Sequence, residues 1–313
     1  MEKRIQGTTG LYALFGSPVG HSGSPAMYNK AFAHYGLDYA YLAFDVKEDG
    51  MEKAFESIRL LNIKGGNFTT PCKVAAAKLV DRLSPAAQMV CACNAFTNEN
   101  GVITGHITDG IGFVQNLEKH GVSVKNKKVV IFGAGGAATS IQVQLALEGV
   151  KEIHIFNPKD KFFERAEQLK ETISKTCPGC TVTVNDVADQ ALLREKIANC
   201  DIVINGTIMG MKPFEDVSLV DPSYFRSDLI VADTVYNPEK TKLILQSHRR
   251  QGNAAGTGCR ELQAVYRQRN AFGLIQSGVR GGKHENEKLF DVNCMCLHVL
   301  FDTWDSGHYS EPE

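Results

Sequence analysis

The chain has 313 residues, of which 43% are hydrophobic and 22% are charged, and its formal net charge is −1. This length is too great for one ordinary core and fits two globular domains, and the composition excludes a disordered chain. The near-zero net charge gives no reason to expect nucleic acid or an anionic membrane as a partner.

Strand-like and helix-like stretches alternate through residues 1–110. Strands are expected at Tyr12–Phe15 and Tyr39–Val46, helices at Ala26–Tyr35 and Met51–Leu61, and a turn at Gly65–Phe68. Such alternation predicts an α/β domain with a largely parallel sheet.

A second α/β unit begins near Lys127. The apolar stretch Val129–Phe132 is typical of a central parallel strand, and the helix Ala137–Glu148 follows it. Later strands are expected at Lys151–Phe156, Asp201–Asn205 and Leu229–Thr234. We expect the boundary between the two domains at Thr108–Gly112.

Two features bear on membrane and redox roles. The uncharged run Val129–Leu147 is nearly long enough to span a bilayer, but its glycines and glutamines favour a strand, a turn and a helix. The nine cysteines and the polar stretch Met1–Gly10 predict a cytoplasmic protein with reduced thiols. Cys177–Cys180 has the spacing of a redox motif but is interpreted as a plain loop, because nothing near it completes a metal site.

A glycine-rich segment joins the strand of the second unit to its helix. Its glycines permit a tight turn and let backbone N–H groups approach a pyrophosphate at the helix N-terminus. The segment reads Gly133, Ala134, Gly135, Gly136, Ala137 and Ala138. Asp160 follows the next strand and can accept hydrogen bonds from ribose hydroxyls, which favours NAD, whereas Lys159 and Lys161 keep NADP as the alternative. The alternative interpretation of Asp160 is a solvated loop acid.

Two serines near the N-terminus share one turn. Ser22 and Ser24 can present both hydroxyls to an anion, and neutral hydroxyls bind a carboxylate without a full positive charge. The alternative is a helix cap, since Ser24 precedes Pro25. His21 is interpreted as orienting this turn rather than relaying protons.

Several separate motifs occur in a fixed order along the chain. They are Asn67–Lys73, Ala92–Asn94, Gly105–Gly110, Asn205–Pro213 and Val235–Pro238. With the serine and glycine turns they closely resemble the shikimate dehydrogenase family over roughly residues 8–248, and most of all its quinate/shikimate branch. The resemblance implies an N-terminal α/β substrate domain plus a Rossmann-type dinucleotide-binding domain, with a cleft between them. The domains would be residues 1–110, completed by part of 250–275, and residues 111–249, with 276–313 as an unassigned tail.

The resemblance also implies an activity and the residues that carry it. The reaction would interconvert a ring hydroxyl and a ring ketone on shikimate or quinate, with NAD(P) and no metal. Lys73 and Asp109 would be the catalytic pair, because a lysine can hold the proton of the reacting oxygen and a carboxylate can position it; the alternative is a surface ion pair. The substrate would contact Ser22, Ser24, Tyr41, Thr69, Asn94, Thr108 and Gln263. The dinucleotide would contact Gly133, Ala134, Gly135, Gly136, Ala137, Asn157, Asp160, Thr207, Val235, Tyr236 and Asn237.

The chain departs from the family at two places. Ile107 stands where the family usually has Asn, which removes a hydrogen bond near Asp109. Gly256–Ala264 matches only part of a late family motif, with Gln263 at the expected position and Gln268 as a competitor. A shifted reading frame after about residue 250 and genuine divergence both explain this.

These departures motivate the alternative of a catalytically impaired homologue that still binds dinucleotide and substrate. A nucleotide- or S-adenosylmethionine-binding transferase is a weaker alternative, because it leaves the serines and the Lys73/Asp109 pair unexplained. As partners we expect a small carboxylic acid, no nucleic acid, no membrane, and a homodimer as a possible assembly. The sequence leaves shikimate and quinate equally open.

Overall fold

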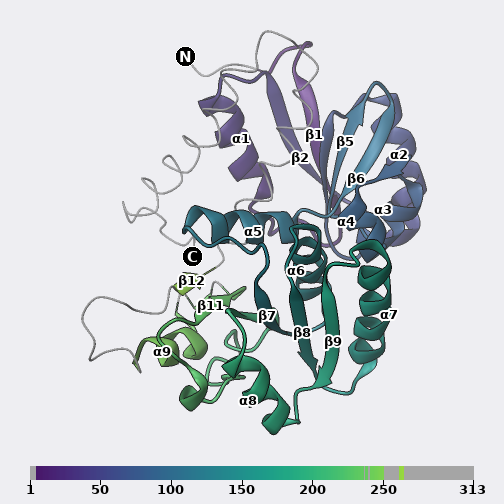
Figure 1. Cartoon of the computed structure of the whole chain (residues 1–313). Coiled ribbons are helices and arrows are strands. Elements are labelled where there is room, and N and C mark those ends of the chain that lie inside the picture. Colours follow the sequence, from purple (N-terminus) through teal and green to yellow (C-terminus); the bar gives the residue numbers. More distant parts are fainter. Residues whose placement is uncertain (1–4, 236, 239, 250–260, 264–313) are drawn as a thin grey trace. The chain divides into compact units, whose positions relative to one another are not determined.

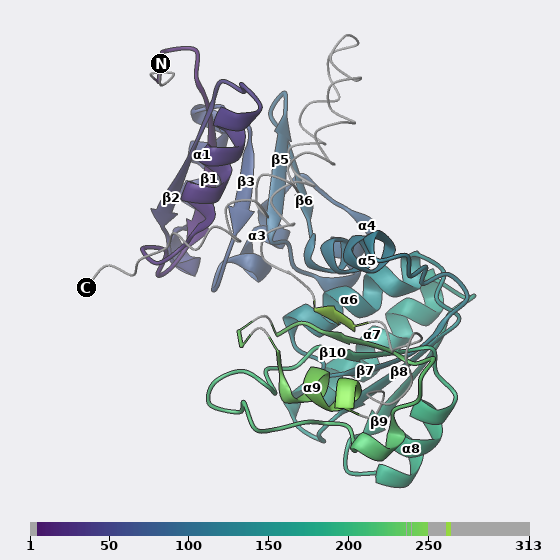
Figure 2. The same ribbon diagram turned by 90° about the vertical axis from the view of Figure 1, so that its left-hand side faces the viewer.

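The computed structural model describes residues 5–249 and 261–263, apart from Tyr236 and Glu239. The chain divides into two compact units (Figures 1 and 2). The first contains the described residues up to Arg82 together with Cys93–Gly105, and the second contains Leu83–Ala92 and the described residues from His106 onward. The predicted α/β class is confirmed in both.

The first unit is built on a six-stranded sheet of order β2-β1-β3-β5-β6-β4. Its strands are β1 (Gly10–Gly16), β2 (Tyr39–Asp45), β3 (Gly65–Phe68), β4 (Arg82–Leu83), β5 (Ala95–Glu99) and β6 (Val102–His106). Strand β1 pairs in parallel with β2 and β3, and β3 pairs antiparallel with β5. The strand order therefore reverses direction at β1 and β3.

Helices lie on both faces of this sheet (Figure 1). They are α1 (Ser24–His34), α2 (Met51–Leu60) and α3 (Lys73–Leu79), with a short 3₁₀ turn η1 (Glu48–Gly50). Alternation along β1 points Tyr12 and Leu14 toward α1, where they join a core that includes Phe32. Phe15 points to the other face, where Phe68 stacks with Phe55 of α2.

The second unit has a six-stranded sheet of order β12-β11-β10-β7-β8-β9, and every neighbouring pair is parallel. Its strands are β7 (Lys128–Phe132), β8 (Glu152–Asn157), β9 (Thr181–Asp186), β10 (Ile202–Asn205), β11 (Ile230–Asp233) and β12 (Glu261–Gln263). Read from β9, this is the order 3-2-1-4-5-6 of dinucleotide-binding sheets, whose topological switch lies between the first and fourth strands. Here that point is between β7 and β10.

Helices also cover both faces of the second sheet (Figure 1). They are α4 (Pro85–Val90), α5 (Asp109–Lys119), α6 (Gly136–Leu147), α7 (Lys161–Thr176), α8 (Gln190–Ala198) and α9 (Lys242–Arg249), with a 3₁₀ turn η2 (Pro222–Tyr224). Leu193 of α8 and Leu243 of α9 pack with Phe132 and Val203 in one buried cluster. The run Val129–Leu147 is a strand, a turn and a helix, as predicted, and no helix among the described residues is long and apolar enough to cross a membrane.

Candidate functional site

The loops that follow β1 and β3 meet at the reversal of the first sheet. The amide of Thr69 donates to the carbonyl of Phe15 at 2.9 Å, and the amide of Ser17 donates to the carbonyl of Thr70 at 3.1 Å. A Cβ on Gly16 would lie 2.2 Å from Thr69 Cγ2, so only glycine fits there. Ligands of α/β sheets bind at such reversal points, so this geometry marks a candidate site at the ends of β1 and β3.

The two serines share the turn that leaves this point. Ser22 Oγ accepts a hydrogen bond from the amide of Ser24 at 3.3 Å, and both residues are half-buried. Ser24 is the first residue of α1, and Gly23 is its N-cap without a side-chain hydrogen bond. The alternative that Ser24 caps the helix is therefore wrong, because the helix begins one residue earlier than that alternative requires. His21 is exposed beside them.

A buried polar chain links β2, β3 and the segment before β5. Tyr41 Oη donates to Asn67 Oδ1 at 2.7 Å, and Asn67 Nδ2 donates to the carbonyl of Asn94 at 3.3 Å. The ring of Tyr28 stacks on Tyr41 with centroids 4.2 Å apart. Tyr41 has no exposed surface, and burial raises the pKa of its hydroxyl well above the usual range, so it remains a neutral donor. In this structure Tyr41 therefore supports Asn67 and Asn94.

Lys73 is the first residue of α3, directly after the Thr69 turn. The amide of Cys72 donates to the carbonyl of Thr69 at 2.8 Å, and the carbonyl of Lys73 accepts from the amide of Cys93 at 3.0 Å. Burial raises the pKa of the Cys93 thiol to about 12, although the nearby charge of Lys73 opposes this shift. These contacts gather Thr69, Lys73 and Asn94, three predicted site residues, around the start of one helix.

Asp109 begins α5 in the second unit, with Thr108 as the N-cap residue. Asp109 is 7% exposed and Ile107 is 4% exposed. Position 107 is therefore an interior one, where an apolar side chain is stabilised by burial. A Cβ on Gly110 would lie 2.2 Å from the carbonyl oxygen of Ser140, so α5 packs directly on α6, the helix that follows the glycine turn.

The predicted glycine turn lies at the switch point of the second sheet. Gly133 has φ +98°, and a Cβ there would lie 2.9 Å from Thr207 Cγ2 in the loop after β10. Two side chains of α6 hold the turn: Gln142 Nε2 donates to the carbonyl of Gly133 at 2.8 Å, and Thr139 Oγ1 donates to that of Gly135 at 2.8 Å. Sequence reasoning missed both, because neither residue belongs to the glycine pattern.

Asn157 and Asp160 stand together at the end of β8. Asp160 is the N-cap of α7: its Oδ1 accepts from the amide of Phe162 at 2.8 Å and from Asn157 Nδ2 at 3.0 Å. Asp160 is exposed and Asn157 is buried. Lys159 reaches Asp186 with Nζ 3.8 Å from Oδ2. Asp160 is thus more ordered than a solvated loop acid, and its second oxygen is not used in these bonds.

A second group lies after β10 and β11, and sequence reasoning missed two of its members, Asp233 and Thr241. Asn205 Nδ2 donates to Asp233 Oδ1 at 2.9 Å, and Asn205 Oδ1 accepts from Thr207 Oγ1 at 2.7 Å. Thr241 Oγ1 donates to Asp233 Oδ2 at 2.6 Å. The predicted cofactor residues Thr207 and Val235 border this network, whereas Tyr236 lies outside the described residues. Asn237 is exposed.

The remaining predictions fall at the end of the described chain and at Cys177–Cys180. Gln263 is the last residue of β12, which pairs with β11 in the second sheet, and its side chain is not described. These three strand residues thus lie in the second unit, whereas the sequence assigned part of 250–275 to the first domain.

Cys177 and Cys180 are free thiols in the turn between α7 and β9, and the described residues contain no group of metal-binding side chains.

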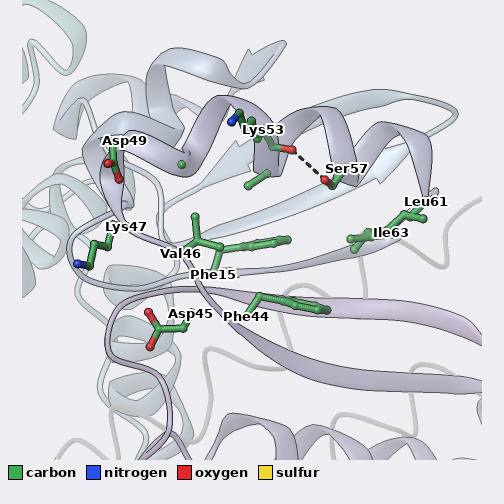
Figure 3. Close-up of a pocket in the computed structure, with 12 residues that line it drawn as sticks. Phe15, Phe44, Asp45, Val46, Lys47, Asp49, Lys53, Ser57, Leu61 and Ile63 are labelled. Carbon is green, nitrogen blue, oxygen red and sulfur yellow. Dashed lines mark hydrogen bonds between the residues drawn. The ribbon is translucent and has the colours of Figure 1, made fainter.

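A cavity of about 580 Å³ opens between β2 and α2 in the first unit (Figure 3). Phe15 and Phe44 lie beneath α2, and charged side chains such as Asp45 and Lys47 gather at one end. None of the predicted site residues is among the described residues that line it. The candidate site is therefore defined by the strand ends and not by this cavity.

The sequence and the fold match characterised proteins. Residues 14–96 match the shikimate dehydrogenase substrate binding domain. A shikimate dehydrogenase (NADP(+)) of Listeria monocytogenes is 47% identical over 244 residues, covering 77% of this chain and 83% of that protein. One of Streptococcus uberis is 46% identical over 248 residues, covering 78% of this chain and 83% of that protein. The crystal structure of shikimate 5-dehydrogenase from Listeria monocytogenes in complex with shikimate and NAD superposes with a TM-score of 0.82 at 41% identity, covering 88% of this chain and 95% of that one.

Proposed function

The chain belongs to the shikimate dehydrogenase family of NAD(P)-dependent oxidoreductases, and on that premise we propose that it interconverts shikimate and 3-dehydroshikimate. The observation that carries the proposal is the grouping of Thr69, Lys73 and Asn94 around the start of α3, beside the turn that bears the serines. The first unit would bind the substrate and the second unit the dinucleotide.

The residues of the second unit fit a dinucleotide. A Cβ on Gly135 or Gly136 would meet no atom within 4 Å, so the N-terminus of α6 leaves room for a pyrophosphate next to backbone N–H groups. Gly133–Ala137 would hold the phosphates, Asn157 and Asp160 the adenosine ribose, and Thr207 and Val235–Asn237 the nicotinamide side. When bound, the nicotinamide supplies or receives the hydride.

The first unit would bind the substrate and manage its proton. Ser22 and Ser24 donate hydroxyl hydrogen bonds to the carboxylate, and Thr69 and Asn94 hold the ring hydroxyls. Lys73 Nζ binds the reacting oxygen, takes its proton when the alcohol is oxidised, and returns it when the ketone is reduced. Asp109 would be the second member of this catalytic pair, the carboxylate that the family motif supplies. Thr108 and Gln263 complete the proposed set of contacts.

Steady-state kinetics with shikimate and quinate, each against NAD and NADP, tests the proposal. We expect turnover with shikimate and formation of reduced cofactor, because the relatives at 46–47% identity are named shikimate dehydrogenases. Calorimetric titration of the same ligands separates the impaired homologue from an unrelated activity. Binding of both ligands without turnover would support impairment, and binding of neither would contradict the family reading of the site.

The preference for NAD over NADP that we propose rests on Asp160. Its second carboxylate oxygen can accept from ribose hydroxyls and would repel a 2′-phosphate, although the two compared relatives are named as NADP(+) enzymes. Asp160→Asn keeps a good N-cap and removes only the charge. We expect it to lower the ratio of kcat/KM for NAD over NADP, while Asp189→Asn, at the exposed acid that caps α8 by accepting from the amide of Leu192, leaves that ratio unchanged. Equal ratios in both variants would remove Asp160 from cofactor choice.

Two further expectations complete the proposal, namely a cytoplasmic location and a homodimer. The described cysteines are free thiols, which suits a reducing compartment. Light scattering on the purified full-length chain would measure the assembly, and a monomer at working concentration would contradict the homodimer.

A further inference from the structure

A buried carboxylate organises the carboxyl ends of β10 and β11. Asp233 has no exposed surface. Its oxygens accept from Asn205 Nδ2 at 2.9 Å, from the amide of Val235 at 2.9 Å and from Thr241 Oγ1 at 2.6 Å. All three donors are neutral, and burial raises the pKa of Asp233 to about 6. No cation among the described residues pairs with it, and an unpaired buried carboxylate destabilises a fold, so its presence needs an account beyond packing.

The three hydrogen bonds fasten three different segments to one point. Asn205 shapes the loop after β10, because its amide also donates to the carbonyl of Met209 at 2.9 Å and its oxygen accepts from the amide of Thr207 at 3.0 Å. The amide of Val235 begins the loop after β11. Thr241 precedes α9, and a Cβ on Gly210 would lie 3.1 Å from its side chain.

These segments border the second half of the dinucleotide site. Thr207 touches the glycine turn across the switch point, because a Cβ on Gly133 would lie 2.9 Å from its methyl group. In this fold one half of the sheet holds each nucleotide. The proposed ribose contact of Asp160 would put the adenosine half at β7–β9, which leaves β10–β12 for the nicotinamide half.

We propose that Asp233 is a positioning residue, whose carboxylate fixes the loops after β10 and β11 around the nicotinamide ring and so sets the geometry of hydride transfer. The inference rests on the proposed function. It differs from a purely structural role in one respect: loss of the carboxylate should affect the nicotinamide and spare the adenosine half of the ligand.

The test compares Asp233→Asn with the unaltered full-length enzyme, using NAD and ADP-ribose, which lacks the nicotinamide. Asparagine keeps the shape but cannot accept all three hydrogen bonds. We expect the dissociation constant for ADP-ribose to stay within about twofold and that for NAD to rise several-fold. We also expect kcat to fall by about tenfold or more, with a larger kinetic isotope effect from NADH deuterated at the transferred position.

A matched pair of variants serves if Asp233→Asn does not fold. Thr241→Val removes one donor at constant shape, and Thr241→Ser retains the hydroxyl. We expect the valine variant to weaken NAD and not ADP-ribose, and the serine variant to behave as the unaltered enzyme. Equal weakening of both ligands, or an unchanged kcat and isotope effect, would overturn the inference. An unaltered enzyme that binds neither these two ligands nor their 2′-phosphorylated forms would instead contradict the proposed function.

Discussion

The two sheets share the same topological feature but carry different chemical groups at it. Each reverses its strand order once, at β1 and β3 in the first unit and at β7 and β10 in the second, and predicted ligand residues follow those strands in both. The first unit offers side chains there, such as Ser22 and Lys73, while the second offers chiefly the backbone of a glycine-rich turn. One site should therefore be sensitive to the chemical group of a residue and the other to the volume of a residue.

Lys73→Met should give the largest effect and tests whether the site of the first unit depends on a side-chain group. We expect kcat to fall roughly 10²–10⁴-fold, the usual contribution of a general acid or base, with an unchanged thermal midpoint. Lys78→Met is the matched control, because Lys78 is an exposed lysine near the end of the same helix. Near-normal turnover in the Lys73 variant would show that the first unit does not carry the proton chemistry.

A pair of glycine substitutions tests whether the turn of the second unit depends on residue volume. Gly133→Ala places a side chain at φ +98° and against Thr207, so we expect a loss of about 1–3 kcal/mol in the free energy of unfolding, even without ligand. Gly135→Ala meets open space at φ −72° and should leave stability unchanged. It should weaken NAD binding by about tenfold, since the methyl group occupies the space of the phosphate. The two measurements are thermal unfolding and calorimetric titration.

Ser22→Ala should have a smaller effect, confined to substrate binding. Loss of one hydrogen bond to a charged group costs about 1.5–3 kcal/mol, so we expect KM for shikimate to rise by about tenfold or more with little change in kcat. Ser57→Ala is the control, because that hydroxyl donates only to the carbonyl of Lys53 within α2. A KM equal to that of the control would place the carboxylate elsewhere.

The smallest expected effect is a pH dependence of stability at Asp233. Its pKa is about 6 in the folded chain and near 3.8 when unfolded, so the folded state takes up a proton first as the pH falls. Between pH 7 and pH 5 the free energy of unfolding should rise by about 1 kcal/mol relative to Asp233→Asn, and this gain is lost again as the pH rises through 6. The groups facing the carboxylate, Asn205, Thr241 and the Val235 amide, do not titrate there. Parallel stability curves for the two proteins would contradict the shift.

The sequence predicted those parts of the fold that depend on local pattern. The apolar strand of β7, the glycine turn and α6 were readable because each is encoded within a few consecutive residues. The start of α1 was missed because Ser24–Pro25 has the composition of a cap, whereas Gly23 occupies the cap position. Asn67, Gln142 and Asp233 were missed for another reason. Their hydrogen bonds join segments far apart in the chain, such as Asn205 and Asp233, and no short motif records such a partnership.

Helices α5 and α6 pack most closely on each other at Gly110. Since even a methyl group at position 110 would collide with the carbonyl of Ser140, the helix that begins with Asp109 and the helix that begins at the glycine turn approach backbone to backbone here. This close approach therefore helps to set the spacing between the proposed acid and the proposed phosphate-binding turn. Selection for that spacing can then act on Gly110, which reacts with nothing but whose lack of a side chain lets the two helices lie this close.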